Sequence, residues 1–485
     1  MRSLRPFLCG PGCLALLLGT AAHAATPRID EVQKRLGITR LSVQSLRLDS
    51  PAPSVALDLD GRRVTLRLER STLRAPGFRV LVQTATGALE EAPAPAAASY
   101  RGTVDGMPGS VVGGTIRNGR LRAAIGLADG RVFYVQPLEE FAPGSEPGAH
   151  AVYDAADVIG AEGICATSEP SVVVPESSGF GTAGSGPHVA EISFDADYEF
   201  WQANVASVPG TIADIEDVMA AVNVIFERDC DLTHEIRTIV VRTAPSDPYS
   251  TTDASALLTQ FRNHWNEAQT GVVRDVAHLM TGKNLDGGTI GIAFLGAVCR
   301  VDRAYGLSQS RFTNVMSWRS ALTAHELGHN WNANHCDAVV PCNIMCSTIN
   351  HCSGFGLPNF EPQAITAITN FAASRTCLDT PRLAVGDALG DGTVRFSPPT
   401  PSVFTGDAGA TLRYYLEQGV AATLDIYDVA GHRVTRLAEG THAPGWHQAT
   451  WRGRDASGRP VRAGIYYARL GTPGAALTHT LVLLR

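Results

Sequence analysis

The first third of the chain alternates apolar and polar residues in short runs that are separated by tight-turn pairs. In SVALDLDGRRVTLRL, apolar residues occupy every second position on both sides of Asp60-Gly61. An Asp-Gly or Asn-Gly pair between two alternating runs is typical of a two-residue β-hairpin turn. Asn118-Gly119 and Asp129-Gly130 repeat this signal. We therefore predict a β-rich domain over residues 25 to about 160.

Residues 188–380 follow a different pattern, in which helix-like and strand-like segments alternate. Apolar residues recur every three or four positions across 212–226, and the β-branched run IRTIVVR follows them. The segment DASALLTQFRNHW begins with Asp253, a typical helix N-cap, and continues with one apolar face. VAHLMT and GIAFLG have the composition of buried strands. The pattern predicts an α/β domain with a mixed sheet and helices.

Two further changes in composition and residue pattern mark domain boundaries. SEPSVVVPESSGFGTAGSGP, from Ser168 to Pro187, is rich in Ser, Gly and Pro and has no lasting period, which is typical of a linker open to proteolysis. Residues 381–485 contain short strand-like runs between Gly-rich turns, which predicts a small immunoglobulin-like β-sandwich.

The size and the charge of the chain limit the number of domains and the kinds of partner that we expect. A length of 485 residues with 44% hydrophobic content is enough for several packed cores. The formal net charge is −7, and Lys and Arg are spread along the chain. This balance argues against a nucleic-acid partner.

The first 24 residues have the features of a secretory signal peptide. Arg2 and Arg5 precede a short apolar run, and Ala22-His23-Ala24 fits a cleavage site before Ala25. The alternative is a membrane anchor, but the apolar run is too short to span a bilayer comfortably. We therefore expect a secreted protein, extracellular or at the cell surface, with no stable membrane insertion.

The segment HELGHNWNANHCD carries the strongest chemical signal. On a helix His325 and His329 lie on one face, one turn apart, so both imidazoles can bind one ion. Three protein nitrogens around tetrahedral zinc leave a fourth position for a water whose pKa falls to about 7, and Glu326 is placed to take its proton. A lone histidine is usually an ordinary surface or core residue, but that reading does not explain the complete H-E-x-x-H string.

His335 can join the other two histidines only if the chain turns back after the helix. Such a turn normally uses glycine in a left-handed conformation, and here Asn332 holds that position. Asn is the non-glycine residue that adopts this conformation most readily. We therefore predict a positive φ at Asn332.

This stretch resembles the metzincin metallopeptidases, whose pattern is H-E-x-x-H-x-x-G-x-x-H followed by a methionine turn. CNIMCS supplies Met345, and HELGHN with a Cys-flanked methionine is most similar to the reprolysin (adamalysin) group, although Cys336 here separates the third histidine from Asp337. The resemblance implies zinc as cofactor and an inhibitory propeptide over 25–187. The C-terminal residues are similar to the immunoglobulin-like module of many secreted bacterial enzymes.

The resemblance also implies a substrate cleft. By analogy, the strand Gly291, Ile292, Ala293, Phe294 and Leu295 forms its upper rim and pairs with an extended peptide. From the residues alone, a buried strand with no role in the cleft is the alternative for GIAFL.

Ten cysteines are present, and Cys9 and Cys13 lie in the leader, which leaves eight. An even number in an exported chain favours disulfides. The resemblance pairs Cys299 with Cys377. Around the methionine turn, either two local bridges or a second metal site is consistent with the four remaining neighbours, Cys336, Cys342, Cys346 and Cys352.

Cys165 has two alternative roles. In EGICATSEP it lies at the end of the propeptide, where its thiolate can bind the zinc and keep the precursor inactive. The alternative is a disulfide with Cys230.

A calcium site is the least supported expectation. Glu191 and Asp275 match positions where reprolysins bind structural calcium, and hard oxygen ligands suit that ion. The expected downstream Asn is missing, and solvated surface carboxylates explain the same residues.

The sequence thus predicts a secreted zinc endopeptidase that is made as a zymogen and cuts protein or peptide substrates. Two other functions are kept in view: a non-catalytic adhesion or binding protein that retains the fold, and a zinc hydrolase acting on a non-peptide bond. The C-terminal module is expected to contact the cell surface or the secretion machinery.

Overall fold

The computed structural model describes residues 29–159 apart from 47 and 49–53, then 163–167, 188–337, 343–349 and 358–378, and most of 394–484. The predicted signal peptide (1–24) and the whole of the predicted linker (168–187) lie outside these residues. The chain folds into two compact units, one reaching to Leu378 and one that begins at Asp379 and holds the C-terminal strands. Each unit is described by itself.

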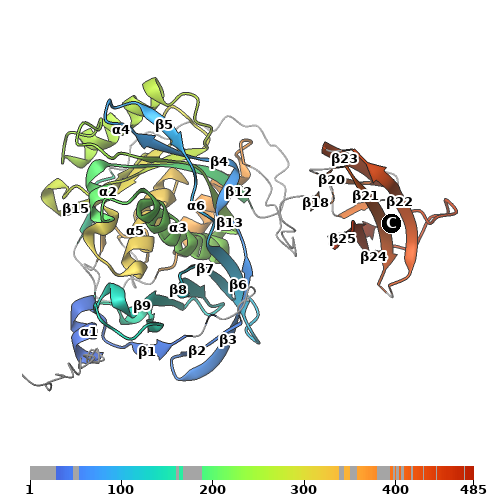
Figure 1. Cartoon of the computed structure of the whole chain (residues 1–485), viewed down its shortest axis with the longest axis horizontal. Coiled ribbons are helices and arrows are strands. Elements are labelled where there is room, and N and C mark those ends of the chain that lie inside the picture. Colours follow the sequence, from blue (N-terminus) through green and yellow to red (C-terminus); the bar gives the residue numbers. More distant parts are fainter. Residues whose placement is uncertain are drawn as a thin grey trace, which may run out of the picture. The chain divides into compact units, whose positions relative to one another are not determined.

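An antiparallel sheet of eight strands forms much of the N-terminal region (Figure 1). Its spatial order is β1-β10-β9-β8-β7-β6-β3-β2. The strands are β1 (Ser42–Ser45), β2 (Ser54–Leu59), β3 (Arg62–Arg70), β6 (Ser99–Val104), β7 (Val111–Arg117), β8 (Arg120–Gly126), β9 (Val132–Pro137) and β10 (Ala149–Asp154). Helix α1 (Ile29–Leu36) precedes them, and the short 3-10 turns η1 (Leu138–Glu140) and η2 (Ala155–Asp157) flank β10.

Two of the three predicted two-residue turns are confirmed, whereas the hairpin at Asp129-Gly130 has a longer turn, in which the Leu127 amide donates to the Arg131 carbonyl. Asp60 and Gly61 have φ of 50° and 79° and join β2 to β3, with Leu59 opposite Arg62. Asn118 and Gly119 join β7 to β8 in the same way. Both central residues of these turns need positive φ, which Asp, Asn and Gly tolerate.

The second sheet has nine strands in the order β17-β11-β15-β16-β14-β12-β13-β4-β5. Its strands are β4 (Arg74–Gln83), β5 (Leu89–Ala92), β11 (Gly163–Cys165), β12 (His188–Ala196), β13 (Leu232–Val241), β14 (Val276–Met280), β15 (Thr289–Ala293), β16 (Tyr305–Ser308) and β17 (Thr348–Ile349). β15 runs antiparallel to β16, whereas β12, β14 and β16 are parallel. The sheet is therefore mixed, as the sequence predicts.

Helices pack with this sheet. They are α2 (Tyr198–Ala203), α3 (Val208–Cys230), α4 (Ala254–Ala268), α5 (Met316–Asn330) and α6 (Pro362–Ala373), with the 3-10 turns η3 (Asp286–Gly288) and η4 (Ser310–Phe312). Asp253 caps α4 by accepting a hydrogen bond from the Ala256 amide, as predicted. The helix predicted over 212–226 is α3, and it is buried along most of its length.

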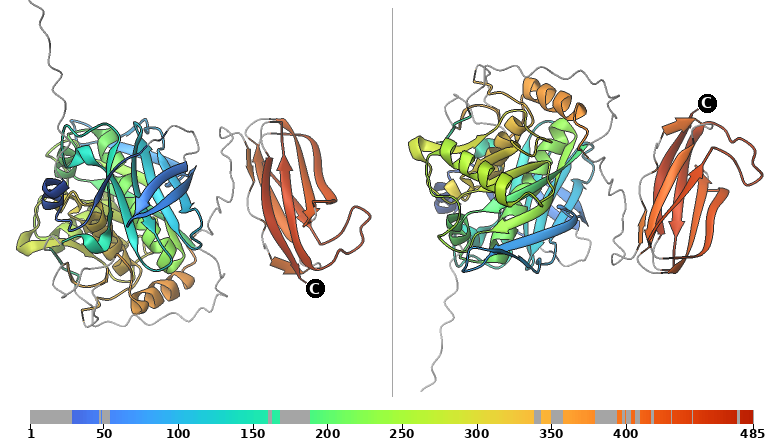
Figure 2. Two further views of the ribbon diagram at one scale, coloured as in Figure 1. Left: turned by 90° about the horizontal axis from the view of Figure 1, so that it is seen from below. Right: turned by 90° about the horizontal axis from the view of Figure 1, so that it is seen from above.

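Three strands that the sequence assigns to the propeptide belong to the second sheet. β4 and β5 extend one end of it, and β11 is inserted near the other end. One hydrophobic core also joins the two regions, since it holds Tyr134 and Val80 together with Ile215 and Ile239. In both views of Figure 2 the blue and cyan N-terminal strands pack against green and yellow elements. The N-terminal region and residues 188–378 therefore fold as one unit.

The C-terminal unit is a β-sandwich of a three-stranded and a five-stranded sheet, as predicted. The strands are β18 (Val394–Phe396), β19 (Val403–Thr405), β20 (Ala410–Leu416), β21 (Val420–Asp428), β22 (Arg433–His442), β23 (Gly445–Trp451), β24 (Gly464–Gly471) and β25 (Ala476–Leu484). Their core includes the fully buried rings of Trp451, Tyr414 and Phe396.

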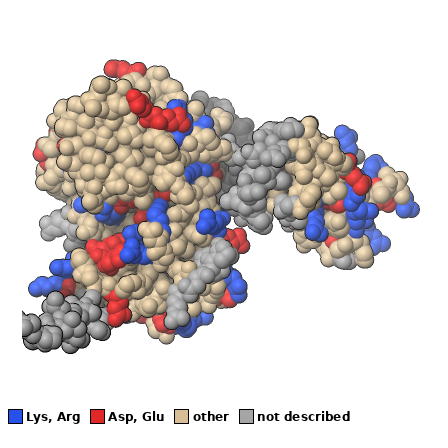
Figure 3. Space-filling view, in the orientation of Figure 1, with Lys and Arg blue, Asp and Glu red and all other residues tan. Residues whose placement is uncertain are grey.

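Charges are mixed over the surface of the larger unit. On the face shown in Figure 3, basic and acidic side chains alternate over its lower part, and the part around α4 and β15 is largely uncharged. This face presents no broad basic surface. Within the part of the chain that the structure describes, no helix is both long and apolar enough to cross a membrane.

Candidate metal centre and substrate cleft

Three imidazoles converge beside the end of helix α5. His329 Nε2 lies 3.1 Å from His325 Nε2 and 3.1 Å from His335 Nε2. His325 and His329 project from consecutive turns of α5, and His335 returns after a turn at Asn332. Asn332 has φ of 74°, which confirms the predicted left-handed turn.

Hydrogen bonds fix the orientation of two of these rings. His325 Nδ1 donates to the Ile344 carbonyl at 2.5 Å, and His329 Nδ1 donates to the Ala333 carbonyl at 2.8 Å. Both Nε2 lone pairs are then free for a metal. Burial lowers the pKa of His325 to about 4 and the pKa of His329 well below its ordinary value, so both rings are neutral at pH 7. Neutral imidazole is the form that binds metals.

A sulfur completes the donor set. Cys165 Sγ lies 3.6 Å from His329 Nε2, and the donor atoms of Cys165 and the three histidines lie within 4.8 Å of one another. Tetrahedral zinc places two nitrogen ligands about 3.3 Å apart and a nitrogen and a sulfur about 3.6 Å apart, from bonds of about 2.05 and 2.3 Å. The four donors therefore fit a zinc ion in both chemistry and spacing.

Glu326 contacts the sulfur of this donor set. It is fully buried, its Oε2 accepts a hydrogen bond from the Cys165 thiol at 3.6 Å, and its Oε1 has no partner within the described residues. Burial raises the pKa of Glu326 and the pKa of Cys165 well above their ordinary values. A buried carboxyl oxygen without a partner is costly in a fold, and such groups cluster at functional sites.

Two glycines make room for this arrangement. A Cβ on Gly291 would lie 2.2 Å from Glu326 Oε1, and a Cβ on Gly328 would lie 2.5 Å from Met345 Sδ. Met345 is fully buried and packs against α5 at Gly328, where the helix has no side chain. The predicted methionine turn therefore lies directly against the helix that carries His325 and His329. Sequence reasoning did not identify Gly291 as a neighbour of Glu326, because the two residues belong to different elements.

The predicted rim strand borders the site, but it begins and ends two residues earlier than predicted. Gly291, Ile292 and Ala293 lie in β15, whereas Phe294 and Leu295 follow its end. One edge of β15 pairs with β16 and the other pairs, in parallel, with β11. Asn330 ties this rim to α5, since its side-chain amide donates to the carbonyls of Phe294 (2.9 Å) and Tyr305 (3.0 Å).

Strand β11 fills the cleft between β15 and β17. The Ala166 amide donates to the Gly291 carbonyl at 3.0 Å, and the Cys165 amide donates to the Ser347 carbonyl at 2.8 Å. Thr167 adds a side-chain contact, because the Ala293 amide donates to its hydroxyl at 3.0 Å. The cleft thus holds a peptide in extended form, with the thiol of Cys165 at the imidazole cluster.

The geometry agrees with comparisons to known proteins. Residues 187–376 match the family described as Metallo-peptidase family M12 (Reprolysin_5). This segment is therefore similar to M12 metallopeptidase domains, and we call it the metallopeptidase domain below. Residues 399–472 match the FlgD Ig-like domain. The fold and the family resemblance expected from the sequence are confirmed.

One curated relative of the metallopeptidase domain is the zinc metalloproteinase-disintegrin-like brevilysin H2a of Gloydius brevicauda. It is 40% identical over 111 residues, which cover 19% of this chain and 26% of that protein. The chain therefore matches about a quarter of the length of this relative.

The cysteines of the metallopeptidase domain follow the prediction in part. Cys299 and Cys377 form the expected disulfide. Cys336 and Cys346 are buried with their sulfurs 2.7 Å apart, and Cys342 and Cys352 lie outside the described residues. Cys230 is buried at the end of α3 and is not bonded to Cys165, so the alternative bridge between them is not formed.

The calcium prediction gains no support. The Glu191 carboxylate lies 3.5 Å from Arg237 Nη1, and Asp275 accepts a hydrogen bond from the Glu191 amide. Among the described residues, the donors gathered around Asp275 are the two sulfurs of the Cys299–Cys377 disulfide. Calcium requires six to eight oxygens, which this group does not supply.

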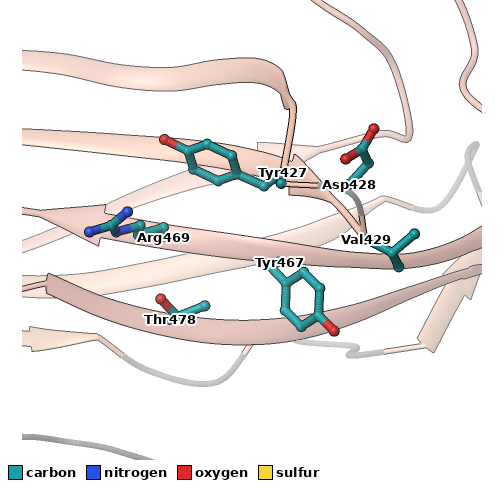
Figure 4. Close-up of a pocket in the computed structure, with 7 residues that line it drawn as sticks. Tyr427, Asp428, Val429, Tyr467, Arg469 and Thr478 are labelled. Carbon is teal, nitrogen blue, oxygen red and sulfur yellow. The ribbon is translucent and has the colours of Figure 1, made fainter.

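The C-terminal module has a shallow depression of about 280 Å³ on its five-stranded sheet (Figure 4). It is lined by Tyr427, Asp428, Val429, Gly431, Tyr467, Arg469 and Thr478. These residues include no imidazole or thiol, so the depression lacks the soft and borderline ligands that transition metals prefer.

Proposed function

We propose that this chain is the precursor of a secreted zinc endopeptidase whose ligands are His325, His329 and His335 and whose general base is Glu326. The convergence of the three Nε2 atoms beside Cys165 Sγ, which also contacts the buried Glu326 carboxyl, carries this proposal. Zinc bound there would supply Lewis-acid activation of a water and of the substrate carbonyl.

The residues of the chain supply the remaining functions. The Glu326 carboxyl, whose Oε2 lies 3.6 Å from Cys165 Sγ, is placed to accept a proton from the attacking water and to pass it to the leaving amine. Rim strand β15 and strand β17 offer backbone groups to an extended substrate, as they now do to β11. The presence of a peptide strand in the cleft favours a peptide bond over other hydrolysable bonds and argues against a purely adhesive role.

Latency follows from the same contacts. The sulfur of Cys165 occupies the position beside the histidines that a catalytic water would need, and β11 covers the rim strand. Export is supported by the leader sequence and by the Cys299–Cys377 disulfide, since disulfides persist in oxidising compartments. For the C-terminal module we propose contact with the cell surface or the secretion machinery.

The variant Glu326→Gln tests the proposed chemistry. It removes the base and keeps all three imidazoles, so we expect the processed enzyme to retain zinc and to lose peptidase activity by about 100-fold or more. Glu267→Gln, at an exposed position near the end of α4, is the matched control. Zinc content and casein cleavage are measured on the same samples. Cleavage by Glu326→Gln at the rate of the control would refute the assignment.

A further inference from the structure

Strand β13 of the metallopeptidase domain is not an edge strand, because β4 of the N-terminal region pairs with it. The pairing is parallel, with Thr238 opposite Arg79 and Val241 opposite Val82. β5 then pairs with the outer side of β4. Without the N-terminal region, the amide and carbonyl groups along one side of β13 would have no partners, and such an edge is prone to aggregation.

Helix α3 depends on the N-terminal sheet for part of its cover. The helix is buried along most of its length, which a helix in water achieves only with neighbours on several sides. β7 crosses it closely: a Cβ on Gly113 would lie 2.6 Å from the Ala220 carbonyl oxygen and 2.8 Å from Val224 Cγ2. Figure 1 shows α3 between β7 and β8 and the sheet that carries β13.

The N-terminal region also caps the helix of the metal centre. No side chain of the cap residue Val315 satisfies the first amides of α5. Instead, Gln136 at the end of β9 accepts a hydrogen bond from the Met316 amide at 3.0 Å and donates to the Asn314 carbonyl at 3.2 Å. Tyr134 adds a hydrogen bond to Ser320 at 2.9 Å. Amides at the start of a helix need such partners.

Buried ion pairs complete this interface. Glu216 of α3 is 3% exposed and is paired with Arg74 of β4 at 2.6 Å and with Arg117 of β7 at 2.7 Å. Its neighbour Asp217 is also paired with Arg117. The basic partners of Glu216 and Asp217 come from the N-terminal strands, whereas Asp214, one turn earlier in α3, is paired with Arg319 of α5.

We propose that residues 29–159 are a permanent subunit of the folded enzyme and that loss of β11 alone opens the cleft. This inference rests on the proposed function for the meaning of the cleft. β11 is a separate inhibitory strand: it spans three residues and contacts the cleft through a few backbone hydrogen bonds, Thr167 and Cys165. A cut within 168–187 leaves β11 covalently attached to the N-terminal subunit. A second cut, within 160–162, is therefore needed to release it as a short peptide.

Two engineered cleavage sites test this division. Residues 160–162 and 175–181 of the full chain are replaced by recognition sequences for two different site-specific proteases, and the folded protein is cut after purification. After the linker cut alone, we expect residues up to the cut to co-elute with the rest in size exclusion without denaturant, and the enzyme to stay latent. After both cuts, we expect the N-terminal subunit to remain in a one-to-one complex, the β11 peptide to be lost in mass spectrometry, and casein to be cleaved.

Variants at the interface provide the control. Gly113→Leu, which forces β7 away from α3, should release the N-terminal subunit after both cuts, whereas Gly271→Leu, with open space around its Cβ, should not. If Gly113→Leu precursor does not fold, Gln136→Leu should lower the melting temperature of the double-cut complex relative to wild type.

Three results would overturn the proposal. They are elution of residues 29–159 as a separate peak while residues 188–485 keep their melting transition, full activity after the linker cut alone, or retention of the N-terminal subunit by Gly113→Leu as firmly as by Gly271→Leu. Association and melting are measured without any peptidase assay. A double-cut complex that stays together but cleaves nothing therefore contradicts the proposed endopeptidase activity and supports the permanent subunit.

Discussion

Gly291 shows how one side chain of the rim strand controls the position of the proposed base. Because a Cβ there would lie 2.2 Å from Glu326 Oε1 and 2.8 Å from Glu326 Cδ, the variant Gly291→Ala must displace the carboxyl group. We expect the processed variant to retain zinc and to lose turnover by about tenfold to 100-fold, within the usual contribution of a general base. Gly271→Ala, whose Cβ would meet nothing within 4 Å, is the control.

Turnover and zinc content are measured together for these two variants. Equal turnover by Gly291→Ala and Gly271→Ala would show that the carboxyl position is not limiting. Loss of zinc from Gly291→Ala would instead show that the substitution disturbs the imidazoles.

His234 is a second residue with a measurable consequence. Its Nε2 accepts a hydrogen bond from Trp331 Nε1 at 3.0 Å, and an indole nitrogen can only donate, so the ring must be neutral. Burial lowers the pKa of His234 to about 3. In the unfolded chain, His234 binds a proton below about pH 6.5, whereas in the folded chain it stays neutral down to about pH 3. The free energy of unfolding therefore falls with decreasing pH across this window.

The variant His234→Gln should reduce this acid sensitivity. At pH 8 we expect the wild type to be the more stable protein, and the difference between the two unfolding free energies should shrink by about 1.4 kcal/mol per pH unit below pH 6.5. Urea unfolding of both precursors at pH 8, 6 and 5 measures it. Protonation of the other histidines affects both proteins equally. Parallel pH profiles would contradict the predicted pKa shift.

At the scale of elements, the loop that carries His335 is joined to the methionine turn. The Cys336 amide donates to the Met345 carbonyl at 2.9 Å, and the Cys336 and Cys346 sulfurs, which are not bonded in the structure, lie only 2.7 Å apart. We expect these two cysteines to form a disulfide in the exported protein. Closing a loop of this size stabilises a fold by about 3 kcal/mol.

Peptide mapping under non-reducing conditions checks this pairing. The expected result is a cross-linked Cys336–Cys346 peptide, together with a lower melting temperature and weaker zinc retention in the Cys336→Ser/Cys346→Ser double variant. The matched control is Cys230→Ser, because Cys230 is buried but is not bonded in the structure. A bridge from Cys336 to Cys342 or Cys352 would contradict the prediction.

Local elements were predictable because their signals lie within a few residues. Asp60-Gly61 specifies its hairpin, Asp253 caps α4, and the left-handed turn at Asn332 follows from the spacing of the histidines. The bounds of β15 were not predictable, since Leu295 continues the same apolar run beyond the last hydrogen bond to β16, which the Phe294 amide donates to the Tyr305 carbonyl. An apolar run predicts burial, and the end of a strand depends on its partner.

At the scale of the whole molecule, the pairing of strands that are distant in the sequence could not be predicted from the pattern of apolar and polar residues. β11 is inserted beside β15, and Cys165 meets Glu326 across a separation of 161 positions. The addition of β4 to β13 likewise depends on which edges meet in space. The alternating pattern of β4 fits any sheet with one buried face, so it predicted a strand and a separate β-rich propeptide, but not the shared sheet.

Zinc K-edge X-ray absorption of the purified precursor tests the central claim most directly. If the three histidines and Cys165 hold zinc in the latent state, the spectrum contains three nitrogens at about 2.0 Å and one sulfur at about 2.3 Å. The sulfur should be lost in the Cys165→Ser precursor and after release of β11, while the nitrogens remain. A precursor whose bound zinc has no sulfur ligand, or has several sulfurs and no imidazole, would contradict this account of the site.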